Sequence, residues 1–386
     1  MKKGEIKHNV AFLDINGFAH EGFTSGLFIS VKQMLKSFID NNCNSFILSV
    51  SEKSKSKKSK KIYGLGSETL EGIRIKKYFV EKPLDKNNNE AVMAVRILLK
   101  KYRPKIVIVN TPAVFFNSFH ALAVKEVIST GARVMTIVSD ELFPTSQNYP
   151  KKEIEEYYEL INKGSVYAIS NRIADRLREV KVVANKFPQL FDFDKIISKK
   201  RNPRYITMIN RHPIKGISIF NKIARKMTHE SFLLVESWPD VPRWKKKCKN
   251  VRFIKFNKNV KNIYEKTRIL LVPSLCKEGI ARVVIESMMN GIPVIANRIG
   301  SLPEIDTKFI NFVEPPKKIK YKLNKTILYP EVGKNELNRI VDEYVKIINK
   351  IKNGDNKNYD DSKKIALKYA NGNKVKFEKI IKSLLR

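Results

Sequence analysis

The chain has few cysteines, and they form no recognisable pattern. Among 386 residues there are three, Cys43, Cys248 and Cys276. Their spacing matches no metal-ligand motif, and an odd number cannot all pair within one chain. The cysteines therefore argue against both a disulfide framework and a zinc site, and we expect three free thiols.

Long apolar runs are also missing. Runs such as 106–109 and 269–272 have the length of a strand, whereas a helix that spans a bilayer needs about 20 apolar residues. Residues 1–13 include charged side chains and contain no uninterrupted apolar segment of signal-peptide length. We therefore expect no transmembrane helix and no signal peptide, and we expect a cytoplasmic protein.

Acidic residues are scarce relative to basic ones. The chain has 75 Lys and Arg against 38 Asp and Glu, which gives a formal net charge of +37. Such a charge suits an anionic partner, whether nucleic acid, an anionic membrane or a phosphorylated substrate, and says nothing about the fold. A Lys-, Asn- and Ile-rich composition also follows from an AT-rich genome, so charge alone does not identify the partner.

The hydrophobic pattern alternates between short apolar runs and segments of helical spacing, as in α/β proteins. The alternation stops in the polar, basic segment 192–203 and then starts again, which predicts two α/β halves. The predicted strands are 10–14, 45–50, 73–80, 106–109, 133–138, 166–170, 181–184, 205–209, 232–235, 251–254, 269–272 and 293–296. The predicted helices include 26–39, 90–102, 119–129, 172–179, 335–351 and 361–386.

Open parallel sheets bind ligands beyond the carboxyl ends of their strands, where loops lead into helix N-termini. The segment 273–304 reads as strand end, loop, helix, strand and loop, with Glu278 in the loop and Glu286 in the helix. A loop carboxylate accepts hydrogen bonds from sugar hydroxyls, and a helix carboxylate can hold both hydroxyls of a ribose. Backbone N–H groups suited to a diphosphate are expected at Gly279, Ile280, Ala281 and Arg282.

This segment resembles the donor-binding region of glycosyltransferase family 4, whose members are retaining enzymes with the two-lobed GT-B fold. The resemblance implies that Glu278 lies beside the donor sugar and that Glu286 holds the nucleotide ribose. For Glu286 the alternative is a solvated helix residue. The matching positions are Pro273 and Ser274, the two glutamates separated by residues 279–285, the run Gly-Ile-Pro-Val-Ile-Ala at 291–296, Gly300 and Glu304.

A second match follows the predicted strand 205–209, in the sequence Asn-Arg-His-Pro-Ile-Lys-Gly at 210–216. Family members carry an arginine and a lysine here against the donor diphosphate, which implies that role for Arg211 and Lys215. Two fixed cations would stabilise the charge that grows on the leaving nucleotide. The two residues are four apart rather than the commoner five, so Lys215 is the firmer match. An ordinary basic turn is the alternative.

The first half matches the family more loosely. The loop 16–26 ends in Gly26, which can let backbone amides approach a phosphate, although the paired glycines of relatives are missing. Many relatives have a histidine after the strand that corresponds to 133–138. This chain has Val-Ser-Asp-Glu at 138–141 instead, and Asp140 is a candidate for acceptor or donor binding.

The resemblance implies an α/β, GT-B architecture of two Rossmann-like α/β/α domains that face a central cleft, with C-terminal helices returning to the N-terminal domain. We expect residues 1–195 to form the acceptor-binding domain and 196–368 the nucleotide-sugar-binding domain. Residues 369–386 are expected to form the helix that crosses back.

The predicted function is retaining transfer of a hexose from a UDP- or GDP-linked sugar to a hydroxyl of a glycan or lipid-linked acceptor, in surface polysaccharide or glycoconjugate biosynthesis. The spacing of Asp192 and Asp194 falls in the linker and suggests no metal site, so we expect no cofactor and no divalent metal. The basic run 51–61 suggests peripheral attachment to an anionic membrane at its inner face. No nucleic-acid partner is expected. The rival hypotheses are a basic nucleic-acid-binding protein and a catalytically silent relative that binds sugar nucleotides.

Overall fold

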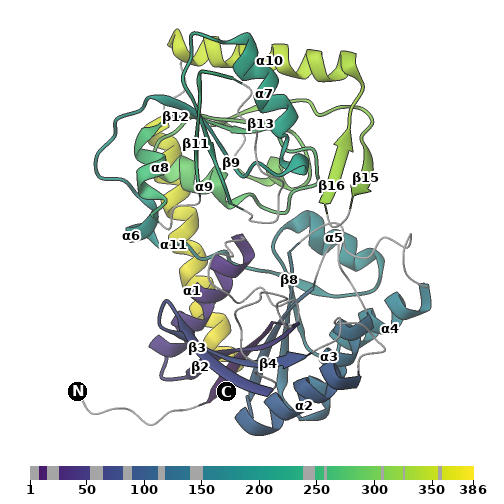
Figure 1. Cartoon of the computed structure of the whole chain (residues 1–386). Helices are drawn as coiled ribbons and strands as arrows, with labels where there is room; N and C mark the ends of the chain where they lie inside the picture. Colours follow the sequence, from purple (N-terminus) through teal and green to yellow (C-terminus); the bar gives the residue numbers. More distant parts are fainter. Residues whose placement is uncertain are drawn as a thin grey trace. The chain divides into compact units, whose positions relative to one another are not determined.

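The protein is described by a computed structural model, in which the chain divides into two compact units (Figure 1). The first unit comprises Met1–Phe23, Leu27–Leu190 and Asn373–Arg386, and the second comprises Thr24–Gly26 and Phe191–Gly372. The structure describes residues 8–14, 26–52, 64–80, 89–111, 118–139, 151–237, 248–255, 259–305, 308–324, 327–354 and 359–386.

The first unit is built on an eight-stranded sheet with the strand order β3-β4-β2-β1-β5-β6-β7-β8. Neighbouring strands are parallel except for β3 and β4, which form an antiparallel pair. The strands are β1 (Asn9–Asp14), β2 (Asn44–Glu52), β3 (Gly64–Leu70), β4 (Ile73–Val80), β5 (Ile106–Thr111), β6 (Arg133–Val138), β7 (Ser165–Ala168) and β8 (Ala184–Lys186).

Both faces of this sheet are apolar, because the parallel strands are covered by helices on each side. Side chains from α2, α3, α4 and α5 pack with one set of alternate strand residues, and side chains from α1 pack with the other set. The helices are α1 (Gly26–Asp40), α2 (Asn89–Tyr102), α3 (Ser118–Ser129), α4 (Lys151–Ile161) and α5 (Asn171–Glu179).

The second unit contains a six-stranded, fully parallel sheet with the order β11-β10-β9-β12-β13-β14, and a separate antiparallel hairpin, β15–β16. One core cluster joins α7 and α10 to the sheet, and another joins α8 and α9 to it. The strands are β9 (Tyr205–Ile209), β10 (Phe232–Val235), β11 (Val251–Ile254), β12 (Thr267–Val272), β13 (Val294–Asn297), β14 (Ile310–Val313), β15 (Lys320–Asn324) and β16 (Ile327–Glu331). The helices are α6 (Phe193–Ile196), η1 (Pro213–Lys215), α7 (Ile217–Lys226), α8 (Lys261–Lys266), α9 (Arg282–Met289), η2 (Leu302–Glu304) and α10 (Lys334–Lys352).

The last helix, α11 (Tyr359–Leu384), contributes side chains to the cores of both units. Ala366 and Ala370 are buried in the core of the second unit. Phe377 and Ile381 are buried in the core of the first, where the Phe377 ring lies edge-on to Phe38, with 6.1 Å between the ring centroids. The helices expected at the C-terminus are therefore present, and the final one returns to the N-terminal unit.

The secondary structure differs from the sequence-based expectation at one predicted strand and at several elements that were not predicted. The strand expected at 181–184 begins only at Ala184, because Lys181 has φ of 61° and lies in a turn that ends α5. In that turn the N–H of Val182 donates to the carbonyl of Leu177 at 2.9 Å. The strands β3 and β14, the helix α4 and the hairpin β15–β16 were not among the predicted elements. The predicted α/β class with mainly parallel sheets is confirmed.

None of the helices that the structure describes is both long enough and apolar enough to cross a bilayer.

Candidate functional site

The loop after β9 has a tightly fixed backbone. Asn210 has φ of 81°, and its side-chain oxygen accepts a hydrogen bond from the N–H of His212 at 3.0 Å. His212 then caps η1, since its Nδ1 accepts a hydrogen bond from the N–H of Ile214 at 3.3 Å. The short helix ends at Gly216, which has φ of 87°. This geometry fixes the backbone at Lys215, the last residue of η1.

Gly216 is required for close contact between this loop and the loop after β12. A Cβ atom built on Gly216 would lie 1.9 Å from the carbonyl oxygen of Pro273, which is a backbone atom. Next to it, the N–H of Leu275 donates to the carbonyl of Ile214 at 2.8 Å. The two predicted loops therefore pack backbone against backbone at the carboxyl ends of adjacent strands.

Lys215 and Glu278 form an ion pair across these loops. The Nζ atom of Lys215 lies 2.7 Å from both carboxylate oxygens of Glu278. The hydroxyl of Ser274 donates to Oε1 of the same carboxylate at 2.5 Å. The side chains of Lys215 and Glu278 are 19% and 11% exposed, so the pair is largely shielded from solvent but still accessible. The structure thus brings together two of the predicted site residues.

Arg211 has a different partner from Lys215. Its Nη2 atom lies 2.6 Å from Oε1 of Glu236, and its guanidinium lies 5.9 Å from the centre of the Phe253 ring. The arginine side chain is only 6% exposed. Arg211 is therefore held towards β10 and β11, and the structure does not pair it with either of the predicted glutamates.

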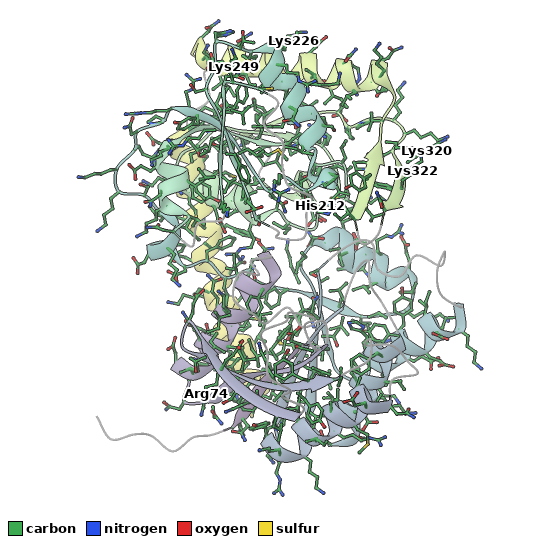
Figure 2. The ribbon with its side chains drawn as sticks, viewed as in Figure 1. Arg74, His212, Lys226, Lys249, Lys320 and Lys322 are labelled. Atoms are coloured by element: carbon green, nitrogen blue, oxygen red, sulfur yellow. The ribbon has the colours of Figure 1, made fainter. Side chains whose placement is uncertain are left out.

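His212, labelled in Figure 2, lies between these two cations in the sequence. Burial is the main cause that lowers its pKa from 6.5 to about 4, and the charges of Lys215 and Arg211 lower it further. The imidazole is consequently neutral at physiological pH. Its capping hydrogen bond requires an unprotonated Nδ1, which agrees with that charge state.

Glu286 lies in a buried polar cluster on α9. The hydroxyl of Tyr264 donates to its Oε2 at 2.7 Å, and the Nε atom of Arg282 lies 3.3 Å from its Oε1. The guanidinium of Arg282 also lies 4.4 Å from the centre of the Phe191 ring. Glu286 is only 7% exposed, which rules out the alternative of a solvated helix residue.

The cluster changes the proton affinities of its members. Burial raises the pKa of Tyr264 well above 10, and the neighbouring charge of Glu286 raises it further. Burial lowers the pKa of Arg282, and the carboxylate of Glu286 opposes that effect. A neutral phenol that donates to a carboxylate, beside an arginine, fixes the orientation of the Glu286 side chain.

The residues that lead into α9 were expected to offer N–H groups to a diphosphate. Ala281 precedes the helix, and Ile280 is buried in the apolar core behind it. Gly279 and Ala281 are partly exposed, whereas Arg282 is buried. Amide groups in the first turn of a helix lack intrahelical partners, so this end of α9 is suited to an anion.

Gly300 brings a third loop to the same place. It has φ of 61°, and a Cβ atom built on it would lie 2.3 Å from the carbonyl oxygen of Glu278. The N–H of Ser301 donates to that same carbonyl at 2.8 Å. Gly300 thus supports the backbone of Glu278 from the loop after β13.

Sequence reasoning missed three residues that hold the Glu278 loop. The buried hydroxyl of Tyr344 donates to Oδ1 of Asn297 at 3.0 Å, and Nδ2 of Asn297 donates to the carbonyl of Ser274 at 2.9 Å. The hydroxyl of Tyr321 donates to the next carbonyl, that of Leu275, at 2.5 Å. Lys320 and Lys322, labelled in Figure 2, flank Tyr321 on β15. No sequence motif pointed to these tyrosines, because they come from α10 and the unexpected hairpin.

The remaining predicted residues can be placed only in part. Gly26 is the first residue of α1, is grouped with the second unit, and a Cβ atom built on it would lie 3.1 Å from Cδ of Arg282. Asp140 lies outside the described residues, as do 53–61 of the basic run. Within the described parts of the chain, no group of three or more His, Cys, Asp or Glu side chains is placed to hold a metal ion.

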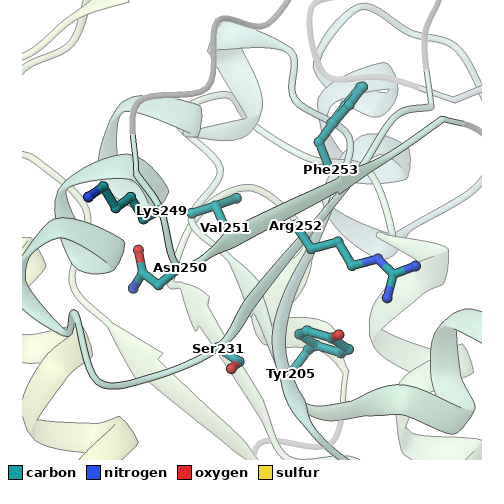
Figure 3. A pocket seen from close by; sticks show the side chains of 7 residues that line it. All are labelled: Tyr205, Ser231, Lys249, Asn250, Val251, Arg252 and Phe253. Carbon is teal, nitrogen blue, oxygen red and sulfur yellow. The ribbon is translucent and has the colours of Figure 1, made fainter.

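A pocket of about 490 Å³ lies elsewhere in the second unit (Figure 3). Its lining includes the residues at or just before the first positions of β9, β10 and β11, so it lies at the amino ends of these strands. The side chains of Lys249 and Arg252 point in different directions. Lys215 and Glu278 follow the carboxyl ends of β9 and β12, so this pocket is separate from the loops that carry them. The lining residues are Tyr205, Ser231, Lys249, Asn250, Val251, Arg252 and Phe253.

Comparison with known proteins identifies one family model that matches part of the second unit. Residues 203–324 match the family model described as Glycosyl transferases group 1. That segment includes Lys215, Glu278 and Glu286. A comparison with curated proteins found no match.

Solved structures resemble the chain over almost its whole length. A sucrose-phosphate synthase from Thermosynechococcus elongatus has a TM-score of 0.70 at 13% identity, with 98% of this chain and 99% of that chain covered. A glycosyltransferase from Rickettsia africae has a TM-score of 0.67 at 17% identity, with 98% and 99% covered. Anabaena HepE in complex with UDP-glucose has a TM-score of 0.70 at 13% identity, with 97% and 100% covered. The chain therefore has the GT-B fold, and its second unit contains a segment similar to glycosyl transferases of group 1.

Proposed function

We propose that the protein is a glycosyltransferase that uses a nucleotide diphosphate sugar. The observation that carries the proposal is the meeting of Lys215, Glu278 and the start of α9 at the carboxyl edge of the second sheet. It combines a fixed cation, a carboxylate and the amide groups at a helix N-terminus, which are groups that suit a diphosphate sugar. HepE was solved with UDP-glucose, and we extend a donor of this class to the present chain.

Each residue has a proposed role in this reaction. The ammonium of Lys215 stabilises the negative charge that develops on the leaving diphosphate, and the N–H groups of Gly279, Ile280, Ala281 and Arg282 contact the phosphates. Glu278 accepts hydrogen bonds from hydroxyls of the transferred sugar, and Glu286 accepts them from the ribose. Since Lys215 and Glu278 contact each other in the structure, the donor has to share or replace part of that ion pair when it binds.

The finer features of the activity are proposals of the same kind. On the family 4 resemblance, we propose transfer of a hexose from a UDP- or GDP-sugar with retention of configuration and without a divalent metal. The acceptor is a hydroxyl of a glycan or lipid-linked saccharide, bound by the first unit. Arg211 and Gly26 remain predicted contributors to the donor site. NMR of the product that shows net inversion, or activity that EDTA abolishes, would contradict the respective feature.

A thermal-shift screen of UDP-, GDP-, ADP- and CMP-sugars tests the proposed donor. A saturating ligand at 100 times its Kd should stabilise the protein by about 2.7 kcal/mol. Lys215→Ala and Glu286→Ala should each weaken the best binder by about tenfold or more, since each removes a charge-assisted hydrogen bond. Lys222→Ala is the matched control, because Lys222 lies on α7 and bonds only to Asn338 among the partners described for it.

Two outcomes would overturn the proposal. The first is that no sugar nucleotide shifts the melting temperature of the wild-type protein. The second is that the Lys222 variant loses as much affinity as the Lys215 variant. Salt-sensitive binding of DNA without any transfer or hydrolysis of a sugar nucleotide would favour the rival nucleic-acid-binding function.

The cytoplasmic location and the attachment to an anionic membrane are further proposals. The location rests on the lack of long apolar runs in the sequence, and the attachment rests on the net charge of +37 and on the basic run 51–61. Lysines near an anionic bilayer contribute about 1 kcal/mol each, so sedimentation with phosphatidylglycerol vesicles should be strong at low salt and weak at high salt. Absence of sedimentation at low salt would refute the attachment.

A further inference from the structure

The pocket at the amino ends of β9, β10 and β11 takes no part in the proposed transfer reaction (Figure 3). Its volume of about 490 Å³ falls within the range of about 300–1,000 Å³ that is typical of small-molecule sites. The lining includes two cations, Lys249 and Arg252, and no acidic residue. The pocket therefore favours an anionic ligand.

Three polar side chains of the lining belong to one face of the sheet. Tyr205 packs against a small apolar cluster around Leu233, and Ile254 packs against the same cluster. Leu233 lies two residues after Ser231, and Ile254 lies two residues after Arg252. Side chains two residues apart on a strand lie on the same face. The three polar residues therefore stand side by side at the starts of three adjacent strands.

The apolar cover of this face leaves the three polar residues open to solvent. The helix that packs over the face, α8, is six residues long and contributes Ile263 to the cluster around Leu233. Ser231 and Arg252 are exposed, and Tyr205 is half-buried. A ligand can therefore reach their side chains without any movement of the core.

The polar groups of these three residues are available to a ligand. In the parts of the chain that the structure describes, neither the hydroxyls of Tyr205 and Ser231 nor the guanidinium of Arg252 has a hydrogen-bond or ion-pair partner. A ligand therefore has no existing side-chain bond to displace when it contacts them.

The surroundings fix the backbone of the pocket and leave it positively charged. Nδ2 of Asn250 donates to the carbonyls of Ala224 at 3.0 Å and Glu230 at 3.1 Å, which joins the turn before β11 to the turn before β10. The carboxylate of Glu230 belongs to the acid next to the lining in sequence, and it pairs with Arg268 and Lys352 instead. The pocket is therefore preorganised, and the nearby carboxylate does not neutralise its cations.

We propose that this pocket binds a phosphate monoester of a small organic molecule. The guanidinium of Arg252 is a planar fork that matches two phosphate oxygens, and the hydroxyls of Tyr205 and Ser231 can donate to the others. The ring of Tyr205 gives the organic part an apolar surface. Lys249 points in a different direction, so it adds attraction at longer range rather than a contact. The site goes beyond the proposed transfer reaction and does not depend on it.

Isothermal titration calorimetry on the full-length protein tests the site. The probes are glucose 6-phosphate, fructose 6-phosphate and glycerol 3-phosphate, and the reference compounds are glucose and inorganic phosphate. We expect the wild type to bind at least one ester, more tightly than either reference compound. Arg252→Ala should weaken that ester by about tenfold or more, because it removes a charge-assisted pair of hydrogen bonds. Tyr205→Phe keeps the ring and loses the hydroxyl, so it should weaken the ester by about fivefold.

Arg225→Ala is the matched control, because Arg225 is an exposed arginine on α7 outside the lining. The proposal is wrong if no ester binds the wild type, or if Arg225→Ala weakens the best ester as much as Arg252→Ala does. It is also wrong if glucose or inorganic phosphate binds as tightly as the best ester. Should the melting curve of Arg252→Ala show that it is unfolded, Ser231→Ala decides, and an unchanged affinity in that variant refutes the site.

Binding of the ester at the donor loops is a separate outcome. Lys215 lies at the carboxyl edge of the second sheet, so Lys215→Ala should keep the affinity for the best ester. Arg252→Ala should in turn keep the thermal shift caused by the best sugar nucleotide. If Lys215→Ala abolishes binding of the ester and Arg252→Ala retains it, the ester binds at the donor loops and the pocket proposal is wrong. If no sugar nucleotide binds the wild type, the donor proposal fails, whatever the esters do.

Discussion

Replacing Gly216 with alanine should damage the second unit far more than an equivalent change elsewhere. Two costs add at this position. An L-residue in the left-handed conformation costs about 1–2 kcal/mol, and φ at Gly216 is 87°. The new Cβ would also lie 1.9 Å from the carbonyl oxygen of Pro273, and overpacking of this kind costs about 1–3 kcal/mol. The sum is a loss of about 2–5 kcal/mol in the free energy of unfolding.

Gly354 provides a matched control for the backbone conformation. Its φ is 90°, and among the described residues nothing lies within 4 Å of a Cβ built on it. Gly354→Ala should therefore cost only the conformational part, about 1–2 kcal/mol. The difference between the two variants isolates the contact between the Gly216 and Pro273 loops.

Urea denaturation followed by circular dichroism measures both variants. Gly216→Ala should have the lower midpoint with an unchanged slope. It should also bind the best sugar nucleotide more weakly than Gly354→Ala, because the displaced loop carries Ser274 and Glu278. Equal destabilisation by the two substitutions would refute the close packing of the loops, and equal donor affinity would refute the link between that packing and binding.

Three further predictions concern single residues. The lowered pKa of His212 should make the free energy of unfolding fall as pH drops from about 6.5 to about 4, because the unfolded state binds a proton there and the folded state does not. His212→Asn keeps a capping group and should flatten this part of the stability profile, whereas an unchanged slope would contradict the lowered pKa. Asn297→Ala removes the hydrogen bonds that link Tyr344 to the carbonyl of Ser274, so it should lower the free energy of unfolding by about 1–3 kcal/mol and weaken donor binding. A change in stability without any change in donor affinity would assign Asn297 a purely structural role. Phe377→Ala should lower the free energy of unfolding by about 3–5 kcal/mol in the same denaturation assay, because Phe377 is buried. Val375 lies on the same helix and is 52% exposed, so Val375→Ala should lower it by less than about 0.5 kcal/mol. Similar losses in the two variants would be inconsistent with the burial of Phe377.

The sequence predicted most of the sheet because buried parallel strands are short apolar runs. The runs 106–109 and 269–272 both became central strands. In contrast, β3 consists largely of polar residues and glycine and forms by antiparallel pairing with β4. A strand of this kind depends on its neighbour more than on its own composition, so no local pattern revealed it.

The sequence indicated candidate site residues but not their contacts. The order of glutamates and glycines in 273–304 pointed to Glu278 and Glu286. Their partners lie far away in the sequence, since Lys215 is 63 residues from Glu278 and Tyr264 is 22 residues from Glu286. Tyr321 contacts the Glu278 loop from a hairpin that no sequence pattern predicted. Long-range pairing depends on how loops pack, which residue spacing does not encode.

The path of α11 has a consequence for the order in which the protein is made. The second unit consists of the continuous segment Phe191–Gly372 and the three residues Thr24–Gly26. The first unit needs Phe377 and Ile381 to fill its core, although its sheet is synthesised before any other part. During translation from N- to C-terminus, the core of the first unit therefore stays incomplete until the second unit and then residues 377–381 have been synthesised. Chaperone binding to nascent chains is accordingly expected to be strongest over the α1 face of the first sheet.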